Sequence, residues 1–66
     1  MATVICFYDD DRAVSVSETP SEVQEAFNAG HGGPFVVHRE RDGSDVFVNP
    51  SAISHWYEKQ ERSYSL

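Results

Sequence analysis

The residues best suited to catalysis in this sequence are one cysteine, three histidines and eleven aspartates and glutamates. A nucleophilic site needs a nucleophile, a base and an orienting group within hydrogen-bonding reach. Cys6, His38 and Asp45 are of these types, but no nearby residue marks Cys6 as activated. Glu40 and Asp45 could act as an acid–base pair, yet a 66-residue chain encloses little water-free volume. We therefore expect a protein that is not an enzyme.

The histidines are also the best candidates for metal ligands. His31, His38 and His55 are separated by seven and seventeen positions, which matches no familiar zinc-binding motif. The acidic run at residues 9–11 lacks the Asp-x-Asp-x-Asp-Gly pattern of a calcium loop. The glycines in residues 30–33 lack the lysine and the Ser/Thr of a phosphate-binding loop. The sequence thus predicts no catalytic, cofactor or metal site, although a small ligand- or metal-binding domain stays open as an alternative.

Size and charge exclude several classes of function. Sixty-six residues allow one domain over residues 1–66. Eleven acidic residues against five basic ones give a net charge of −6, which opposes direct nucleic-acid binding and binding to anionic membranes. No stretch approaches the ~20 apolar residues of a membrane span, and the short apolar run before Asp9 lacks the basic start of a secretory signal.

The cysteine content bears on location and assembly. Cys6 is the only cysteine, so no internal disulfide is possible, which fits a reducing cytosol. A chain this short buries only about 60% of the surface of its unfolded form. Small domains without a disulfide or a metal are often supported by self-association. We therefore expect a cytoplasmic homodimer.

Two strands and a helix are predicted in the first half of the chain. Residues 3–8 are β-branched and aromatic, and residues 13–17 alternate apolar and polar, as is typical of strands. A turn centred on residues 10–11 would place Phe7 opposite Val14. These two strands therefore form a hairpin with one apolar face.

A capping box predicts where the helix begins. Residues 19–22 have the sequence Thr-Pro-Ser-Glu, in which the threonine and glutamate side chains each bond the other's backbone. Val23, Ala26 and Phe27 follow at helical spacing and form one apolar stripe, and Gly30 is a typical helix end. We expect about ten helical residues that pack on a sheet through Val23 and Phe27.

A second hairpin is predicted around Asp42-Gly43. This dipeptide between two β-rich runs favours a two-residue type I′ turn. Such a turn would pair Glu40 with Asp45 and His38 with Phe47. The like charges of Glu40 and Asp45 would destabilise their pairing mildly.

The two faces of this hairpin differ in their predicted roles. One face has only core candidates: Phe35, Val37, Val46 and Val48. The other face has an apolar centre and an acidic edge: Val36, His38, Glu40, Asp45 and Phe47. An uncovered antiparallel face is usually polar, whereas an apolar centre with a polar rim is typical of a protein interface. Either Trp56 or Tyr64 folds across this face, or it binds another protein.

These elements together predict an α+β fold. We expect a small antiparallel sheet of two hairpins in the order ββαββ, with one helix packed on one face. Residues 54–58 would form a fifth strand or a helical piece, and Pro50 ends the strand before them. Residues 60–66 are polar and terminal, which predicts a mobile tail.

The segment Val46-Phe47-Val48-Asn49-Pro50-Ser51-Ala52-Ile53 carries a resemblance. It is similar to small uncharacterised proteins of actinobacteria and their phages, which share a C-terminal V-x-V-N-P-x-x-I/V signature, and the likeness covers most of residues 3–58. The N-P-x-x-I element also resembles the FlbD-type swarming-motility family. In that family the element lies near the N-terminus, so no functional residue is carried over. The resemblance implies a small cytoplasmic accessory protein of a bacterium or phage.

The leading functional hypothesis is a non-enzymatic protein-interaction module that regulates or inhibits a larger protein. Its partner would present a basic surface to the acidic groups. The predicted interface residues are Val36, His38, Glu40, Asp45, Phe47 and Trp56. The main alternative is an acidic nucleic-acid mimic that blocks a DNA- or RNA-binding protein.

Overall fold

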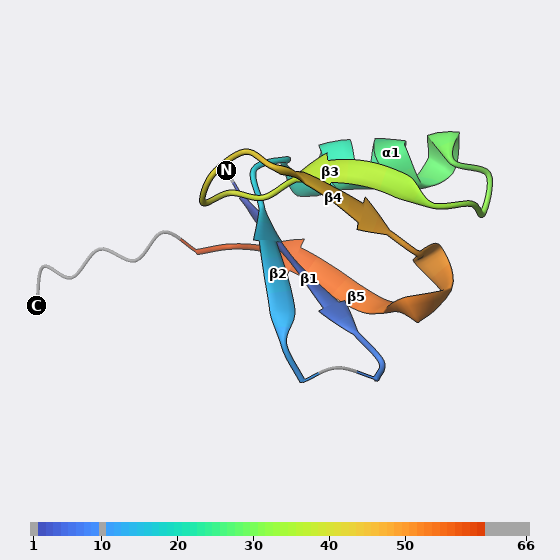
Figure 1. Cartoon of the computed structure of the whole chain (residues 1–66), viewed down its shortest axis with the longest axis horizontal. Helices are drawn as coiled ribbons and strands as arrows, with labels where there is room; N and C mark the ends of the chain where they lie inside the picture. Colours follow the sequence, from blue (N-terminus) through green and yellow to red (C-terminus); the bar gives the residue numbers. More distant parts are fainter. Residues whose placement is uncertain (1, 10, 61–66) are drawn as a thin grey trace, which may run out of the picture.

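The computed structural model describes residues 2–9 and 11–60, which form one α-helix and five strands. The elements (Figure 1) are β1 (Thr3–Phe7), β2 (Ala13–Val16), α1 (Pro20–Ala29), β3 (Phe35–His38), β4 (Asp45–Val48), the short 3-10 helix η1 (Pro50–Ala52) and β5 (Ile53–Glu58). The predicted α+β class is confirmed, and the C-terminal segment forms a fifth strand rather than a helical piece. Most of the predicted tail, residues 61–66, lies outside the described residues.

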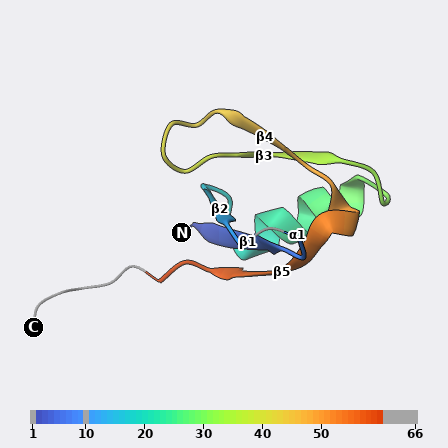
Figure 2. The ribbon, with the colours of Figure 1, turned by 60° about the horizontal axis from the view of Figure 1, so that its bottom comes forward.

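The strands form two antiparallel sheets, where the sequence suggested one. A three-stranded sheet has the order β2-β1-β5, and β3 pairs with β4 in a two-stranded sheet. The sheets meet at one corner, where Val16 bridges Arg39 and the Ser17 N–H donates to the His38 carbonyl at 2.8 Å. The two layers diverge away from this corner, with α1 between them in the view of Figure 2.

The helix α1 begins and ends as the sequence predicts. The Glu22 N–H donates to Thr19 Oγ1 at 3.1 Å, and the Thr19 N–H donates to Glu22 Oε1 at 2.9 Å. Gly30 caps the C-terminal end. Val23 is fully buried, and the Phe27 ring lies against aromatic rings of β3 and β5. Among the described residues, no helix has the length and apolar content needed to cross a membrane.

The core lies where the two sheets and α1 face one another. Its buried residues are Ile5, Val16, Val23, Phe35, Val37 and Val48. The predicted core face of the second hairpin is therefore confirmed at Phe35, Val37 and Val48, and Val46 is half-buried against it. This leaves the opposite face of β3–β4 directed away from the core.

The first hairpin differs from its predicted register by two residues. Ile5, rather than Phe7, lies opposite Val14, and Thr3 lies opposite Val16. Because β1 ends at Phe7 and β2 begins at residue 13, the connection spans residues 8–12 and is longer than a tight turn. A shift of two leaves each side chain on its original face, so the predicted apolar face is retained.

The second hairpin shows the same kind of shift. Val36 lies opposite Phe47, and His38 lies opposite Asp45. The predicted pairings of His38 with Phe47 and of Glu40 with Asp45 are therefore wrong. Glu40 lies beyond the end of β3, so the repulsion expected between Glu40 and Asp45 as a cross-strand pair does not arise.

The loop that joins β3 to β4 explains this shift. A type I′ turn needs positive φ at both central residues, but Gly43 has a φ of 76° and Asp42 does not lie in that region. The Gly43 N–H donates to the Arg39 carbonyl at 2.7 Å, and the Arg39 N–H donates to the Ser44 carbonyl at 2.8 Å. The Ser44 N–H donates in turn to Asp42 Oδ1 at 3.0 Å. The loop therefore spans residues 39–44 rather than two residues.

Candidate interaction surface

The face of β3–β4 that points away from the core carries Val36 and His38 on β3 and Asp45 and Phe47 on β4. We call these four residues the outer face. Its apolar part is exposed: Phe47 retains 73% of its accessible surface and Val36 retains 39%. The two side chains come from residues that lie opposite each other in the ladder, as cross-strand neighbours do on one face of a sheet. They therefore form one apolar patch on the outer face.

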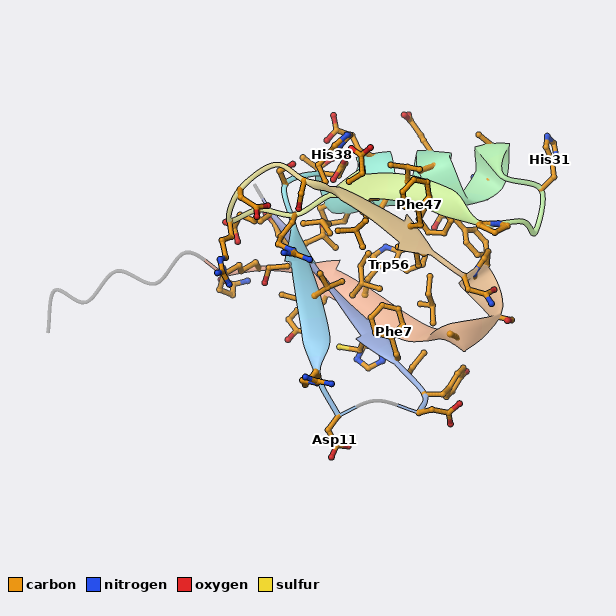
Figure 3. The ribbon with its side chains drawn as sticks, viewed as in Figure 1. Phe7, Asp11, His31, His38, Phe47 and Trp56 are labelled. Carbon is orange, nitrogen blue, oxygen red and sulfur yellow. The ribbon has the colours of Figure 1, made fainter. Side chains whose placement is uncertain are left out.

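Trp56 does not cover this patch. It lies on β5, in the other sheet, where its ring centroid is 5.8 Å from that of Phe27 on α1. Figure 3 shows Trp56 and Phe47 on these separate elements. Trp56 is half-buried against the core, and Tyr64, the other residue proposed as cover, lies outside the described residues. The outer face thus includes Phe47 and Val36 but not Trp56.

Glu40 also lies apart from the outer face. Its backbone N–H donates to the Ser15 carbonyl at 2.9 Å, which places it beside the edge of β2. Its carboxylate accepts a hydrogen bond from Lys59 Nζ at 2.7 Å. Of the six predicted interface residues, the structure brings together Val36, His38, Asp45 and Phe47 and places Glu40 and Trp56 elsewhere.

A polar cluster borders the apolar patch at His38. The Glu18 carboxylate accepts the His38 backbone N–H at 3.0 Å, and it lies 2.6 Å from His38 Nδ1. On the other side of the ring, His38 Nε2 is 3.6 Å from Asp45 Oδ1. The imidazole therefore lies between two carboxylates.

These contacts shift the pKa values of both partners. The hydrogen bond to Glu18 raises the pKa of His38 above its usual value of 6.5, and the charges of Glu18 and Asp45 act in the same direction. Burial raises the pKa of Glu18, but the hydrogen bonds from His38 outweigh it and hold that pKa below 4.5. The cluster therefore favours a protonated His38, which acts as a hydrogen-bond donor rather than as a base.

Glu18 was not identified from the sequence. It lies twenty positions before His38, and neither periodicity nor motif spacing links the two residues. The only local signal is its place directly before the helix cap Thr19. That position brings it near β3 because the hydrogen bond from the Ser17 N–H to the His38 carbonyl holds the two segments together.

The candidate nucleophile and base are not brought together. Cys6 lies on β1, where its cross-strand neighbours are Ala13 and His55, whereas His38 and Asp45 lie on the outer face of the other sheet. A nucleophilic site made of Cys6, His38 and Asp45 is therefore absent from the described part of the chain.

The three histidines also lie on separate elements. His31 is in the loop after α1 with a φ of 51°, His38 is on β3, and His55 is on β5 beside Tyr57. Within residues 2–9 and 11–60, no three His, Cys, Asp or Glu side chains lie close enough together to hold a metal ion.

Comparison with known proteins does not assign this chain to a family. The chain matches no protein-family model and no curated protein. The resemblance carried by residues 46–53 therefore stays a prediction.

Proposed function

We propose that this protein is a non-enzymatic interaction module, a small regulator or inhibitor of a larger protein, and that it binds through the outer face. The observation that carries the proposal is the 73% exposure of Phe47 beside Val36, on a hairpin whose other face forms the core. Large aromatic side chains at the centre of a patch contribute most of the binding energy in many interfaces. An accessory role in the cytoplasm of a bacterium or phage belongs to the same proposal.

The charges around the patch favour a partner with a basic surface. The Asp45 side chain is 63% exposed and lies directly beside the patch, so a lysine or arginine of the partner could reach it. Glu18 lies closer to the His38 ring, at 2.6 Å, than Asp45 does, at 3.6 Å. Asp45 therefore supplies the acidic rim, and Glu40 and Trp56, which lie elsewhere, are no longer part of the proposed interface.

Capture of partners from the native host tests the proposal if two aromatic variants are compared. Phe47→Ala removes the centre of the outer face, whereas Tyr57→Ala removes another exposed aromatic ring, 51% exposed on β5 in the other sheet. We expect Phe47→Ala to weaken binding of the captured protein by tenfold or more, on the order of a hot-spot loss. Tyr57→Ala should bind as the unchanged protein does. Equal binding by all three proteins would reject the proposal.

A second copy of the chain is one partner that the outer face could take. Sedimentation of the purified protein would then show a dimer that Phe47→Ala converts to a monomer, while Tyr57→Ala stays dimeric. A captured partner that is released steeply by salt and by added nucleic acid would instead favour the nucleic-acid mimic, since such complexes depend on displaced counterions.

A further inference from the structure

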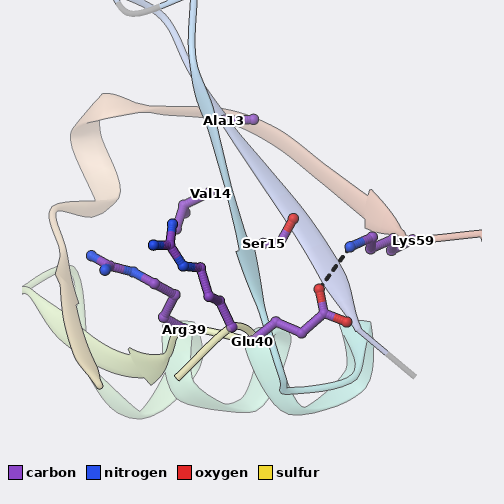
Figure 4. A pocket seen from close by; sticks show the side chains of 7 residues that line it. Ala13, Val14, Ser15, Arg39, Glu40 and Lys59 are labelled. Carbon is purple, nitrogen blue, oxygen red and sulfur yellow. Dashed lines mark hydrogen bonds and ion pairs between the residues drawn. The ribbon is translucent and has the colours of Figure 1, made fainter. Parts of the chain in front are cut away.

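A groove of about 370 Å³ opens at the corner where the two sheets meet. Its walls come from the edge of β2, from the segment that follows β3 and from the residue after β5. The lining residues are Ala13, Val14, Ser15, Arg39, Glu40, Arg41 and Lys59 (Figure 4). None of them belongs to the outer face, so the groove is a separate surface.

The groove exists because β2 and the segment that follows β3 are paired at the corner and then separate. The Ser17 N–H donates to the His38 carbonyl, and the Glu40 N–H donates to the Ser15 carbonyl. In an antiparallel pair the N–H and C=O of one residue point to the same side, so the Ser15 N–H also faces this edge. No further backbone hydrogen bond joins β2 to the segment past Glu40 in the described residues, because the loop of residues 39–44 turns away.

Positive charge is concentrated around this groove. The described residues include four arginines and lysines, and three of them, Arg39, Arg41 and Lys59, line it. Lys59 is paired with Glu40 at 2.7 Å, and Arg39 is 3.8 Å from Asp42. Arg41 forms no ion pair with any described residue. A chain with a net charge of −6 thus places most of its described positive charge at one concave site.

We propose that this groove binds a small multivalent oxyanion, a compound that carries phosphate or several carboxylate groups. A guanidinium presents a planar fork of N–H donors that matches the oxygens of phosphate and carboxylate. Arg41 supplies such a fork without a competing ion pair from any described residue, and its charge acts on the nearby Asp42 carboxylate only as a minor cause of the lowered Asp42 pKa. Arg39 supplies a second fork. The volume lies within the range of small-molecule sites, about 300–1,000 Å³.

The other charges of the groove define the kind of anion that it accepts. Glu40 holds Lys59 on one side of β2, and Figure 4 shows Arg39 on the other. A ligand oxygen that approaches Lys59 competes with the Glu40 carboxylate. We therefore expect the anion to bind to the arginine side chains before it binds to Lys59. A long polyanion would meet the acidic remainder of the surface, whereas a small anion lies within the reach of the local cations, about one Debye length of 8 Å.

Amide NMR titration of the full chain tests this site. The probes are inorganic pyrophosphate for the phosphate source and citrate for the carboxylate source, each against sodium chloride at equal ionic strength. We expect saturable shifts at Ala13, Ser15 and Arg41 with at least one of the two multivalent anions. Arg41→Gln should weaken that binding by about tenfold, since hydrogen bonds to charged groups are among the strongest.

Matched variants separate a site from a general charge effect. Arg12→Gln removes the same charge from the fourth described basic residue, which does not line the groove, and it should change the affinity less than about threefold. Phe47→Ala should leave the titration unchanged, so failure of the proposed interface is distinguishable from failure here. Shifts that stay linear or equal those with chloride, or equal losses in Arg41→Gln and Arg12→Gln, would overturn the proposal.

Discussion

The Glu18 carboxylate contacts His38 at two points, the backbone N–H at 3.0 Å and the ring Nδ1 at 2.6 Å. These bonds join the segment before α1 to the end of β3. The His38 ring in turn lies between Glu18 and Asp45, at the border of the Val36–Phe47 patch. Glu18 therefore makes the closer of the two carboxylate contacts to the histidine that lies on the proposed interface.

This contact predicts a pH-dependent contribution to stability. The raised pKa of His38 means that its contribution is fully present below about pH 6.5 and is lost as the pH rises through the raised value. The lowered pKa of Glu18 means that its contribution is present above about pH 4.5 and is lost as the pH falls through the lowered value. Urea denaturation should show that His38→Gln lowers the free energy of unfolding more at about pH 5.5 than at about pH 9.

The matched variant for this test is Glu18→Gln. Because both substitutions remove the same ion pair, the double variant His38→Gln/Glu18→Gln should be less destabilised at about pH 5.5 than the sum of the single variants. Additive losses, or a loss from His38→Gln that is equal at both pH values, would show that the contact contributes no pH-dependent stability.

At the scale of the elements, sequence patterns within a few residues predicted the helix and the faces of the strands, whereas contacts between distant segments could not be predicted. The capping box at residues 19–22 uses bonds three positions apart, and it forms as expected. The alternation along β3 and β4 assigned Val37 to the core face and Phe47 to the opposite face, and the structure places both side chains on these faces. Face assignment survives a register error of two because side chains alternate with a period of two.

The parts that could not be predicted depend on contacts between distant segments. Register follows from the geometry of the loop, and the Arg39–Gly43 hydrogen bond has no sequence signal as strong as Asp-Gly itself. The position of Trp56 depends on β5 pairing with β1 rather than crossing the hairpin. The Glu18–His38 contact likewise requires the junction of the two sheets. The placement of Val36, His38, Asp45 and Phe47 on one face was therefore predictable, whereas the contact of Glu18 at its border was not.

The capping box gives a prediction for α1 as an element. Thr19→Ala removes the side-chain acceptor of the Glu22 N–H, so we expect a loss of about 1 kcal/mol in the free energy of unfolding. Ser21→Ala is the control, since Ser21 is exposed in the same helical turn and alanine favours a helix. Urea denaturation that gives the same stability for both variants would contradict the role of the cap.

At the scale of the whole molecule, the two sheets depend on one shared core. Within residues 2–9 and 11–60, they pair only at the corner formed by Val16 and Arg39. Val16 is fully buried there and belongs to the same core cluster as Val37 of β3 and Val48 of β4. A two-stranded hairpin is only marginally stable by itself, so β3–β4 needs this core and the contact with α1 to stay folded.

Val16→Ala should therefore destabilise both sheets together. Loss of two buried methyl groups should cost about 2 kcal/mol, which lowers the melting temperature of so small a domain by about 10 °C. Val36→Ala makes the same chemical change on the outer face, where the side chain is 39% exposed, and should cost less than about 1 kcal/mol.

Two signals test whether the sheets unfold together. Trp56 is the single tryptophan and reports on the three-stranded sheet, while the amide signal of Val37 reports on β3–β4. Coincident loss of the two signals on heating is expected in both variants, and earlier loss of the Val37 signal would mean that β3–β4 unfolds independently.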